Sequence, residues 1–115
     1  MSYRRGDVVL VLFPDSNLRT SKRRPALIVQ ADQLSTDLPQ TVVAMITSNL
    51  ARAGHPGRVT VKFGSGGAKE SGLLMDSIVM TDNLATIRYS EIDRVIGTFA
   101  EMKEIDAALR TTLAL

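Results

Sequence analysis

The chain has no cysteine, no tryptophan and only one histidine, His55. The absence of cysteine excludes disulfides, thiolate zinc sites and a cysteine nucleophile, and one histidine cannot build an all-histidine metal centre. No apolar run approaches the roughly 20 residues that a membrane-spanning helix needs, and residues 1–7 lack the apolar core of a signal peptide. We therefore expect a cytoplasmic protein that needs no metal or other cofactor and does not bind a membrane.

Length and charge indicate one domain with a basic N-terminal stretch. The 115 residues are 44% hydrophobic, which is typical of a single globular domain spanning 1–115. The first 24 residues hold six basic and two acidic side chains, a local charge of +4 within a chain of net charge +2. Such a cluster favours a polyanionic partner, although a solvated loop would have the same composition.

Hydrophobic patterning predicts three strands in the first half of the chain. The apolar, β-branched run 8–13 predicts a strand buried on both faces, and Pro14 ends it. The polar segment 15–23 is typical of a mobile loop. The runs 26–29 and 42–46 predict two further buried strands.

The second half adds three strands and a helix. Residues 58–63 alternate between polar and apolar side chains, which predicts a half-buried strand, and the segments 73–80 and 95–99 predict two more. From Glu101 the apolar residues fall at helical spacing, which predicts an amphipathic helix. These elements indicate a mainly β protein with a C-terminal helix, folded as a compact SH3-like β-barrel.

Four short phrases, in this order and spacing, resemble the MazF/PemK family of toxin endoribonucleases, also called mRNA interferases. They are Arg5-Gly6-Asp7-Val8-Val9, Arg23-Arg24-Pro25-Ala26-Leu27-Ile28-Val29, Ile46-Thr47-Ser48 and Gly72-Leu73-Leu74-Met75-Asp76-Ser77. The resemblance runs from Arg5 to the C-terminal helix and implies the barrel fold, a homodimer with a joint RNA groove, and a cognate antitoxin protein. An acidic or apolar antitoxin segment would occupy the basic groove and order the loop 15–23.

Arg24 is the first candidate catalytic residue. Pro25, which we expect at the first position of the second strand, restrains the backbone so that the guanidinium can offer paired donors to phosphate oxygens. The resemblance implies that this arginine is catalytic, whereas the alternative is a surface arginine paired with Asp7 or Asp15. The neighbouring basic residues that we expect to help bind substrate are Arg19, Lys22 and Arg23.

Thr47 and Ser48 place two hydroxyls at the end of a predicted buried strand. Side chains of adjacent strand residues point to opposite faces, so one hydroxyl could bind a phosphate while the other caps the loop. Without the resemblance, such a pair is ordinary turn chemistry. With it, Thr47 is a candidate catalytic residue and Ser48 a supporting one.

Asp76 is the third catalytic candidate, because it interrupts an apolar predicted strand. A carboxylate there would be either desolvated or paired with an arginine, and either environment would suit a general base for a ribose 2′-hydroxyl. The alternative is a structural carboxylate that accepts backbone N–H groups. Some family members have an arginine two residues before the acid, where this chain has Leu74, so a role for that arginine as general acid passes to Arg24.

The remaining candidates are weaker. His55 lies in a Gly-Pro loop without a second histidine to act as acid, so we expect it to contact RNA, as we do Arg88. Phe13 and Phe63 are typical of a core. Residues 64–67 are rich in glycine but lack the Gly-Lys-Ser/Thr ending of a phosphate loop.

The predicted function is a metal-independent, sequence-specific endoribonuclease that cleaves single-stranded RNA. The resemblance implies attack by the 2′-hydroxyl, which leaves a 2′,3′-cyclic phosphate and a 5′-hydroxyl, with recognition of unstacked bases in loops. Arg24 would stabilise the phosphoryl charge and protonate the leaving oxygen, Thr47 and Ser48 would hold phosphate oxygens, and Asp76 is the candidate base.

Two other functions fit a barrel of this kind. A DNA gyrase poison of the CcdB type has a similar fold but acts as an interaction protein, so Arg24 would be dispensable and the C-terminal helix important. A non-catalytic RNA-binding barrel would bind phosphates without turnover. The combination of Arg24, Thr47 and Asp76 favours the enzyme, while Leu74 leaves open a degenerate, weakly active member.

Overall fold

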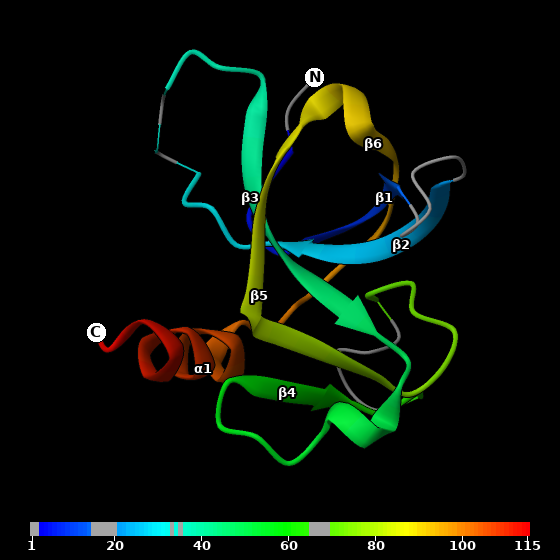
Figure 1. Ribbon diagram of the computed structural model, residues 1–115, viewed down its shortest axis with the longest axis vertical. Helices are drawn as coiled ribbons and strands as arrows, with labels where there is room; N and C mark the ends of the chain where they lie inside the picture. Colours follow the sequence, from blue (N-terminus) through cyan, green and yellow to red (C-terminus); the bar gives the residue numbers. More distant parts are fainter. Residues whose placement is uncertain (1–2, 15–20, 33, 35, 65–69) are drawn as a thin grey trace.

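The computed structural model describes residues 3–14, 21–32, 34, 36–64 and 70–115. In this part of the chain, six strands form one antiparallel sheet in the order β4-β5-β3-β2-β1-β6, and a helix follows the last strand (Figure 1). The elements are β1 (Asp7–Pro14), β2 (Ser21–Ile28), β3 (Gln40–Thr47), η1 (Leu50–Arg52), β4 (Arg58–Val61), β5 (Ser77–Arg88), η3 (Tyr89–Glu91), β6 (Ile92–Thr98) and α1 (Lys103–Leu113).

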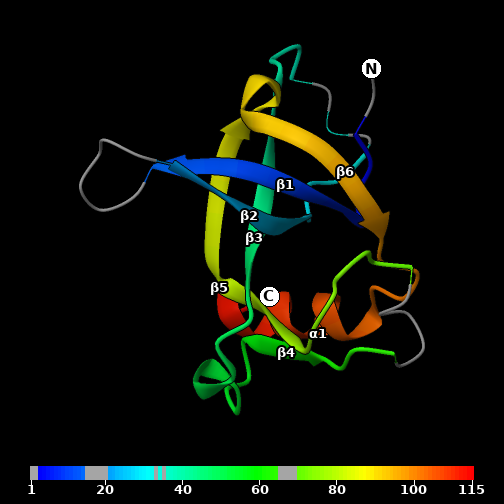
Figure 2. The same ribbon diagram turned by 90° about the vertical axis from the view of Figure 1, so that its right-hand side faces the viewer.

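The sheet bends strongly, and β3 and β5 connect its two ends. Figures 1 and 2 show these two strands running together along the molecule, with β1, β2 and β6 at one end and β4 with α1 at the other. The edge strands β4 and β6 do not pair with each other, so the sheet stays open. The predicted fold, mainly β with a C-terminal helix in an SH3-like barrel form, is confirmed.

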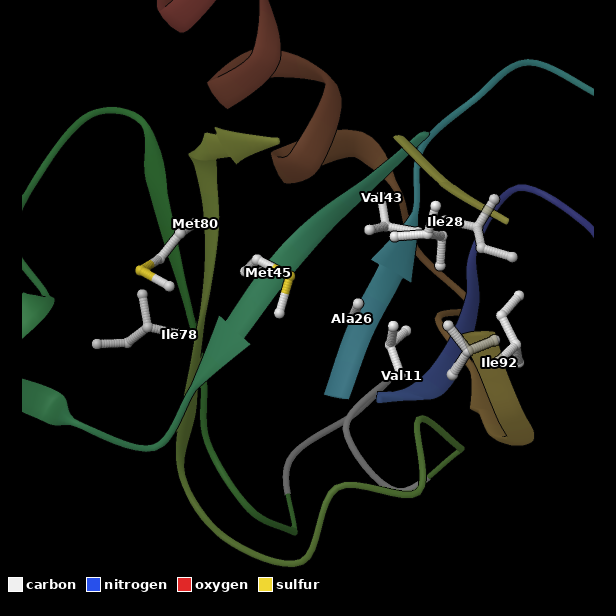
Figure 3. Close-up of a cluster of buried hydrophobic side chains, with 10 residues drawn as sticks. Val11, Ala26, Ile28, Val43, Met45, Ile78, Met80 and Ile92 are labelled. Carbon is white, nitrogen blue, oxygen red and sulfur yellow. The ribbon is translucent and has the colours of Figure 1, made fainter. Parts of the chain in front are cut away.

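Two apolar clusters lie on the two faces of the sheet. Alternate residues of β1 and β2 point to opposite faces, so Val11 and Ala26 join one cluster (Figure 3) and Val8 and Leu27 join the other. The second cluster includes Ile105 of α1, which is fully buried. β1 is therefore buried on both faces at Val8 and Val9, but Leu12, on the same face as Val8, is 41% exposed. The predicted burial on both faces is confirmed only for the first part of the run.

β2 begins earlier than the sequence indicates. The strand starts at Ser21, so Lys22 and Arg23 belong to it and not to a loop, and Pro25 is its fifth residue, not its first. β1 pairs with β2 as far as Ser21, but β3 pairs only with Ala26–Ile28. The first half of β2 therefore lacks a neighbour on one side, which is where a strand tolerates proline.

β5 begins later than predicted, at Ser77, so Asp76 lies before the strand and not in its middle. Gly72, at a φ of +77°, turns the chain in the preceding segment. Phe63 follows the end of β4 and is 61% exposed, so its predicted place in the core is wrong. The side chain of Phe13 lies outside the described residues.

Candidate active site

The site forms where β2 and β3 separate. Their hydrogen-bonded pairing covers only Ala26–Ile28 against Val43–Met45. The same antiparallel register, continued by two residues, would set Arg24 opposite Thr47, but the pairing of β3 with β2 ends at Met45, and from there to Thr47 β3 pairs only with β5. Two neighbouring cavities lie at this gap, and both are lined by Arg24 and Thr47.

The first cavity has a volume of about 480 Å³ and combines three arginines with three hydroxyls on an otherwise largely apolar lining. A largely apolar pocket with a few converging polar groups is the usual form of a ligand site. Its arginines are Arg23, Arg24 and Arg94, its hydroxyl residues are Thr47, Ser48 and Ser77, and its apolar residues include Pro25, Ile46, Leu73, Leu74 and Met75.

Two of the three guanidinium groups have no partner among the residues that the structure describes. Arg23 forms an ion pair with Asp93 at 3.3 Å. Arg24 and Arg94 make no side-chain hydrogen bond or ion pair within the described part of the chain. The carboxylate of Asp7, considered above as a partner for Arg24, instead accepts from the Arg4 N–H at 2.9 Å and from the Thr98 hydroxyl at 3.3 Å. The cavity therefore presents unneutralised positive charge to an anion.

Thr47 combines a turn contact with a place in the cavity. Its Oγ1 accepts the Asn49 N–H at 3.1 Å, and Asn49 Oδ1 in turn accepts the Ala51 N–H at 3.1 Å and caps η1. The Thr47 hydroxyl keeps its own hydrogen, which it can donate to a ligand. Ser48 is exposed and lines the first cavity only.

Asp76 does not have the buried environment that its sequence context predicts. The residue is exposed, and its Oδ1 accepts the Phe63 N–H at 2.7 Å. The carboxylate thereby ties the segment before β5 to the end of β4, which is the structural role considered as the alternative. Its neighbours Met75 and Ser77 line the first cavity, but Asp76 is not among the lining residues. Leu74 is 83% exposed at the same cavity.

One wall of the first cavity is held against β6 by backbone contacts. The Thr98 N–H donates to the Glu70 carbonyl oxygen at 2.8 Å. A Cβ atom on Gly97 would lie 2.3 Å from that same oxygen, and one on Gly72 would lie 2.1 Å from the Ile96 carbonyl oxygen. Only glycine allows so close an approach of two backbone segments. The two glycines therefore set the position of the wall that carries Leu73.

Three other predicted substrate contacts, His55, Lys22 and Arg88, do not line either cavity. His55 is in the segment before β4, and its Nδ1 accepts the Gly57 N–H at 3.4 Å. Lys22 is exposed near the start of β2, and Arg88 is exposed at the end of β5. Arg19 lies outside the described residues. The structure thus brings together Arg23, Arg24, Thr47 and Ser48, but not Lys22, His55 or Arg88.

Sequence reasoning missed Arg94 and Arg52. Arg94 reaches the first cavity because β6 pairs with β1, where Arg94 is opposite Leu10. Arg52 lines the second cavity, of about 400 Å³, together with Arg24 and Thr47. Neither arginine belongs to a recognisable motif, so only the tertiary pairing reveals them. No group of three or more potential metal ligands occurs among the residues that the structure describes.

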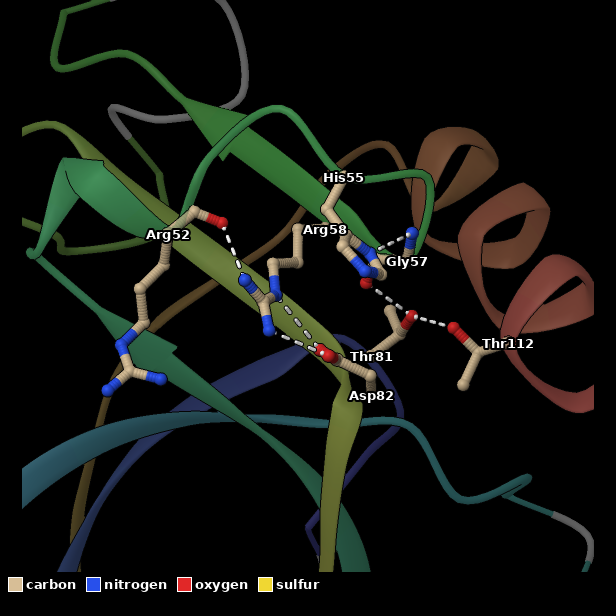
Figure 4. Close-up of polar contacts among 7 residues, drawn as sticks. All are labelled: Arg52, His55, Gly57, Arg58, Thr81, Asp82 and Thr112. Atoms are coloured by element: carbon tan, nitrogen blue, oxygen red, sulfur yellow. Dashed lines mark hydrogen bonds and ion pairs between the residues drawn. The ribbon is translucent and has the colours of Figure 1, made fainter.

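A bidentate ion pair lies next to the second cavity (Figure 4). Arg58 Nε and Nη2 donate to the two carboxylate oxygens of Asp82 at 3.2 and 2.8 Å. These hydrogen bonds hold the pKa of Asp82 below its ordinary value and raise the pKa of Arg58. Arg58 Nη1 also donates to the Arg52 carbonyl oxygen at 2.9 Å, so the same guanidinium holds η1 in place.

Comparisons with known proteins agree with one another on the family of this chain. Residues 4–113 match the family described as "PemK-like, MazF-like toxin of type II toxin-antitoxin system". "Endoribonuclease MazF6" of Mycobacterium tuberculosis is 34% identical over 107 residues, which cover 90% of each chain. "Endoribonuclease EndoA" of Bacillus subtilis is 30% identical over 118 residues, covering 100% of this chain and 97% of the relative.

Solved structures show the same fold. An "Endoribonuclease in complex with its cognate antitoxin from Mycobacterial species" superposes with a TM-score of 0.75 at 24% identity, covering 99% of this chain and 97% of that one. The "Mycobacterium tuberculosis toxin MazF-mt6" gives a TM-score of 0.73 at 23% identity, with coverages of 95% and 97%. The family match over nearly the whole chain, the curated relatives and the shared fold lead to one conclusion: this chain belongs to the PemK-like, MazF-like toxins of type II toxin-antitoxin systems.

Proposed function

We propose that this protein is an endoribonuclease toxin that cleaves single-stranded RNA in the cytoplasm without a metal ion. The observation that carries the proposal is the shared position of Arg24 and Thr47, which line the same two cavities where β2 and β3 separate. Within the described part of the chain Arg24 has no side-chain partner and the Thr47 hydroxyl donates to no acceptor, so both can bind a phosphate oxygen. The relatives named endoribonucleases support RNA as the substrate.

The reaction is a transesterification at one phosphate. A ribose 2′-hydroxyl attacks the adjacent phosphorus, the bond from phosphorus to the 5′ oxygen breaks, and the products carry a 2′,3′-cyclic phosphate and a 5′-hydroxyl. Negative charge grows on the non-bridging oxygens as the new bond forms. Arg24 offers these oxygens paired N–H donors, while Thr47 and Ser48 offer O–H donors. Removing one such donor typically costs about 100- to 1000-fold in rate.

Proton transfer needs a base and a source of a proton. Asp76 lies between two residues that line the first cavity but does not line it itself, and its Oδ1 is occupied by the Phe63 N–H. Its Oδ2 would therefore accept the 2′-hydroxyl proton through one bridging water. A guanidinium does not give up its proton in a protein, so the general-acid role expected of Arg24 from the sequence is not part of this proposal. Arg24 stabilises charge, and the leaving 5′ oxygen takes its proton from water. Arg94, which forms no ion pair with another described residue, adds a second cation at the first cavity and compensates for Leu74, where some family members have an arginine.

The toxin acts as a homodimer and is inhibited by a cognate antitoxin. The relative solved with its antitoxin supports such a partner. The surface around the first cavity has both features that an acidic and apolar antitoxin segment would bind, because Leu74 and Met75 are exposed beside Arg24 and Arg94. Binding there would cover the catalytic groups and exclude RNA.

Cleavage in the absence of metal tests the proposal. The purified protein, its Arg24→Ala variant and the control Arg110→Ala, altered on the exposed face of α1, are incubated with a long single-stranded RNA in EDTA. We expect cyclic-phosphate fragments from the wild type and the control, and a rate at least about 100-fold lower for Arg24→Ala. Intact RNA that all three proteins bind equally would overturn the nuclease and leave an RNA-binding barrel or a gyrase poison.

A further inference from the structure

β5 contains a bulge of three residues next to the second cavity. Met45 pairs with Met80 and Ala44 pairs with Leu84, so residues 81–83 have no partner on β3. Bulges of this kind re-aim side chains and are over-represented near active sites. Each of the three bulge residues has a distinct place in the structure.

The first two bulge residues hold the segment that connects β3 to β4 (Figure 4). The buried Thr81 donates its hydroxyl to the Gly57 carbonyl oxygen at 2.6 Å and contacts the Thr112 hydroxyl of α1 at 2.9 Å. Asp82 binds Arg58 through both carboxylate oxygens, and Arg58 in turn binds the Arg52 carbonyl oxygen. The bulge thereby determines where Arg52 lies.

The third bulge residue, Asn83, lines the second cavity opposite this segment. Neither the amide of Asn83 nor the guanidinium of Arg52 forms a hydrogen bond or ion pair with another described residue. An unpaired guanidinium binds phosphate, and a free carboxamide can donate to and accept from the edge of an unstacked base. Both groups lie in the cavity that also contains Arg24 and Thr47.

We propose that the second cavity is a nucleotide subsite next to the scissile phosphate, in which Arg52 binds a neighbouring backbone phosphate and Asn83 reads the adjacent base. Because Arg24 and Thr47 line both cavities, a phosphate held between them has one flanking nucleotide in each. Asp82 and Arg58 are positioning residues that act through Arg52. This inference rests on RNA being the substrate, and it adds a specificity-determining residue to that function.

Salt-dependent binding tests Arg52. Fluorescence anisotropy with a 20-nucleotide 2′-O-methyl-uridine strand, which cannot be cleaved, is measured for the wild type, Arg52→Ala and the control Arg110→Ala. The logarithm of the association constant falls linearly with the logarithm of the salt concentration, and loss of one phosphate contact should make this slope less steep by about 0.7. The control should keep the wild-type slope. An unchanged slope for Arg52→Ala would overturn the phosphate contact.

The proposal that Asp82 positions Arg52 is tested by combining substitutions at the two residues. We expect Asp82→Asn alone to reduce the slope in the same direction as Arg52→Ala, and to add nothing when Arg52 is already alanine, because the two changes affect one contact. Independent reductions in the double variant would show that Asp82 does not act through Arg52. Circular dichroism of each variant at the assay temperature confirms that the fold is intact.

Base reading is tested by mapping the cut sites on a long RNA. Asn83→Ala should still cleave, but the base preference at one position beside the cut should relax, while Arg110→Ala should keep the wild-type pattern. An unchanged pattern for Asn83→Ala would overturn its role. The binding assay needs no cleavage, so a reduced slope with intact RNA would refute only the nuclease, whereas normal cleavage with unchanged slope and pattern would refute only the subsite.

Discussion

Adding one methyl group at Gly97 should displace a wall of the first cavity. The new Cβ would lie 2.3 Å from the Glu70 carbonyl oxygen and 2.3 Å from the Ser71 carbonyl carbon. Both atoms belong to the backbone, so no flexible side chain can move aside. The segment from Glu70 must separate from β6, and the hydrogen bond from the Thr98 N–H to the Glu70 oxygen must lengthen or break.

The magnitude follows from two terms. Overpacking typically costs about 1–3 kcal/mol and loss of one backbone hydrogen bond about 1 kcal/mol, so Gly97→Ala should lose about 2–4 kcal/mol of unfolding free energy. At about 4 °C per kcal/mol for a domain of this size, Tm should fall by roughly 8–16 °C. A shift of the wall by about 1 Å would also reduce the cleavage rate by up to about 100-fold.

Thermal unfolding followed by circular dichroism measures the fall in Tm. It is done at one fixed protein concentration, since the Tm of an oligomer depends on concentration. Single-turnover RNA cleavage, well below the Tm of the variant, measures the reduction in cleavage rate. Val95→Ala, at an exposed position of the same strand, is the control and should change both quantities little. A Gly97→Ala protein within about 2 °C of wild type and with a normal rate would refute the close approach of the two segments.

Three further predictions concern stability. Ile105 of α1 is fully buried, so Ile105→Ala should lower the free energy of unfolding, measured by urea denaturation, by about 2–5 kcal/mol. A smaller loss would mean that α1 packs loosely against the sheet. Arg5→Ala removes the 2.7 Å ion pair with Asp106 and the hydrogen bond to the Val29 carbonyl oxygen. The free energy of unfolding should therefore fall by about 1–2 kcal/mol in the same assay. Because Arg58 depresses the pKa of Asp82, the stabilisation from that pair is present above the unfolded carboxyl value of about 3.9 and is lost as pH falls through the lower folded value. The Tm difference between wild type and Asp82→Asn should therefore shrink as pH falls from about 5 towards 3, and a difference that grew would contradict the sign of the shift.

The strands and the helix could be predicted because each has a strong local pattern. The continuous apolar run of β1 and the helical spacing after Glu101 both appear where expected. The strand boundaries that were predicted wrongly depend on pairing with strands distant in the sequence. β2 extends back to Ser21 because β1 pairs with it there, and Pro25 is tolerated because β3 does not.

In the candidate site too, residues within local motifs could be predicted, whereas those that depend on contacts distant in the sequence could not. Arg24, Thr47 and Ser48 could be identified because they lie in short recognisable phrases, and the structure brings them to one cavity. The burial expected for Asp76 was wrong, because the segment before β5 packs against β6 instead of continuing the strand. Arg94 could not be predicted, since only the register of β6 on β1 carries it to the cavity.

The most direct test of the central claim, 2′-hydroxyl attack at a phosphate held by Arg24 and Thr47, uses one atom of the substrate. After the cut site is mapped, a strand is made in which only the nucleotide on the 5′ side of that site is 2′-deoxy, and its cleavage by the wild-type protein in EDTA is compared with the all-ribose strand. The account predicts that the single substitution abolishes cleavage at that site while leaving binding nearly unchanged. Continued cleavage of the 2′-deoxy strand at the same site would contradict the account.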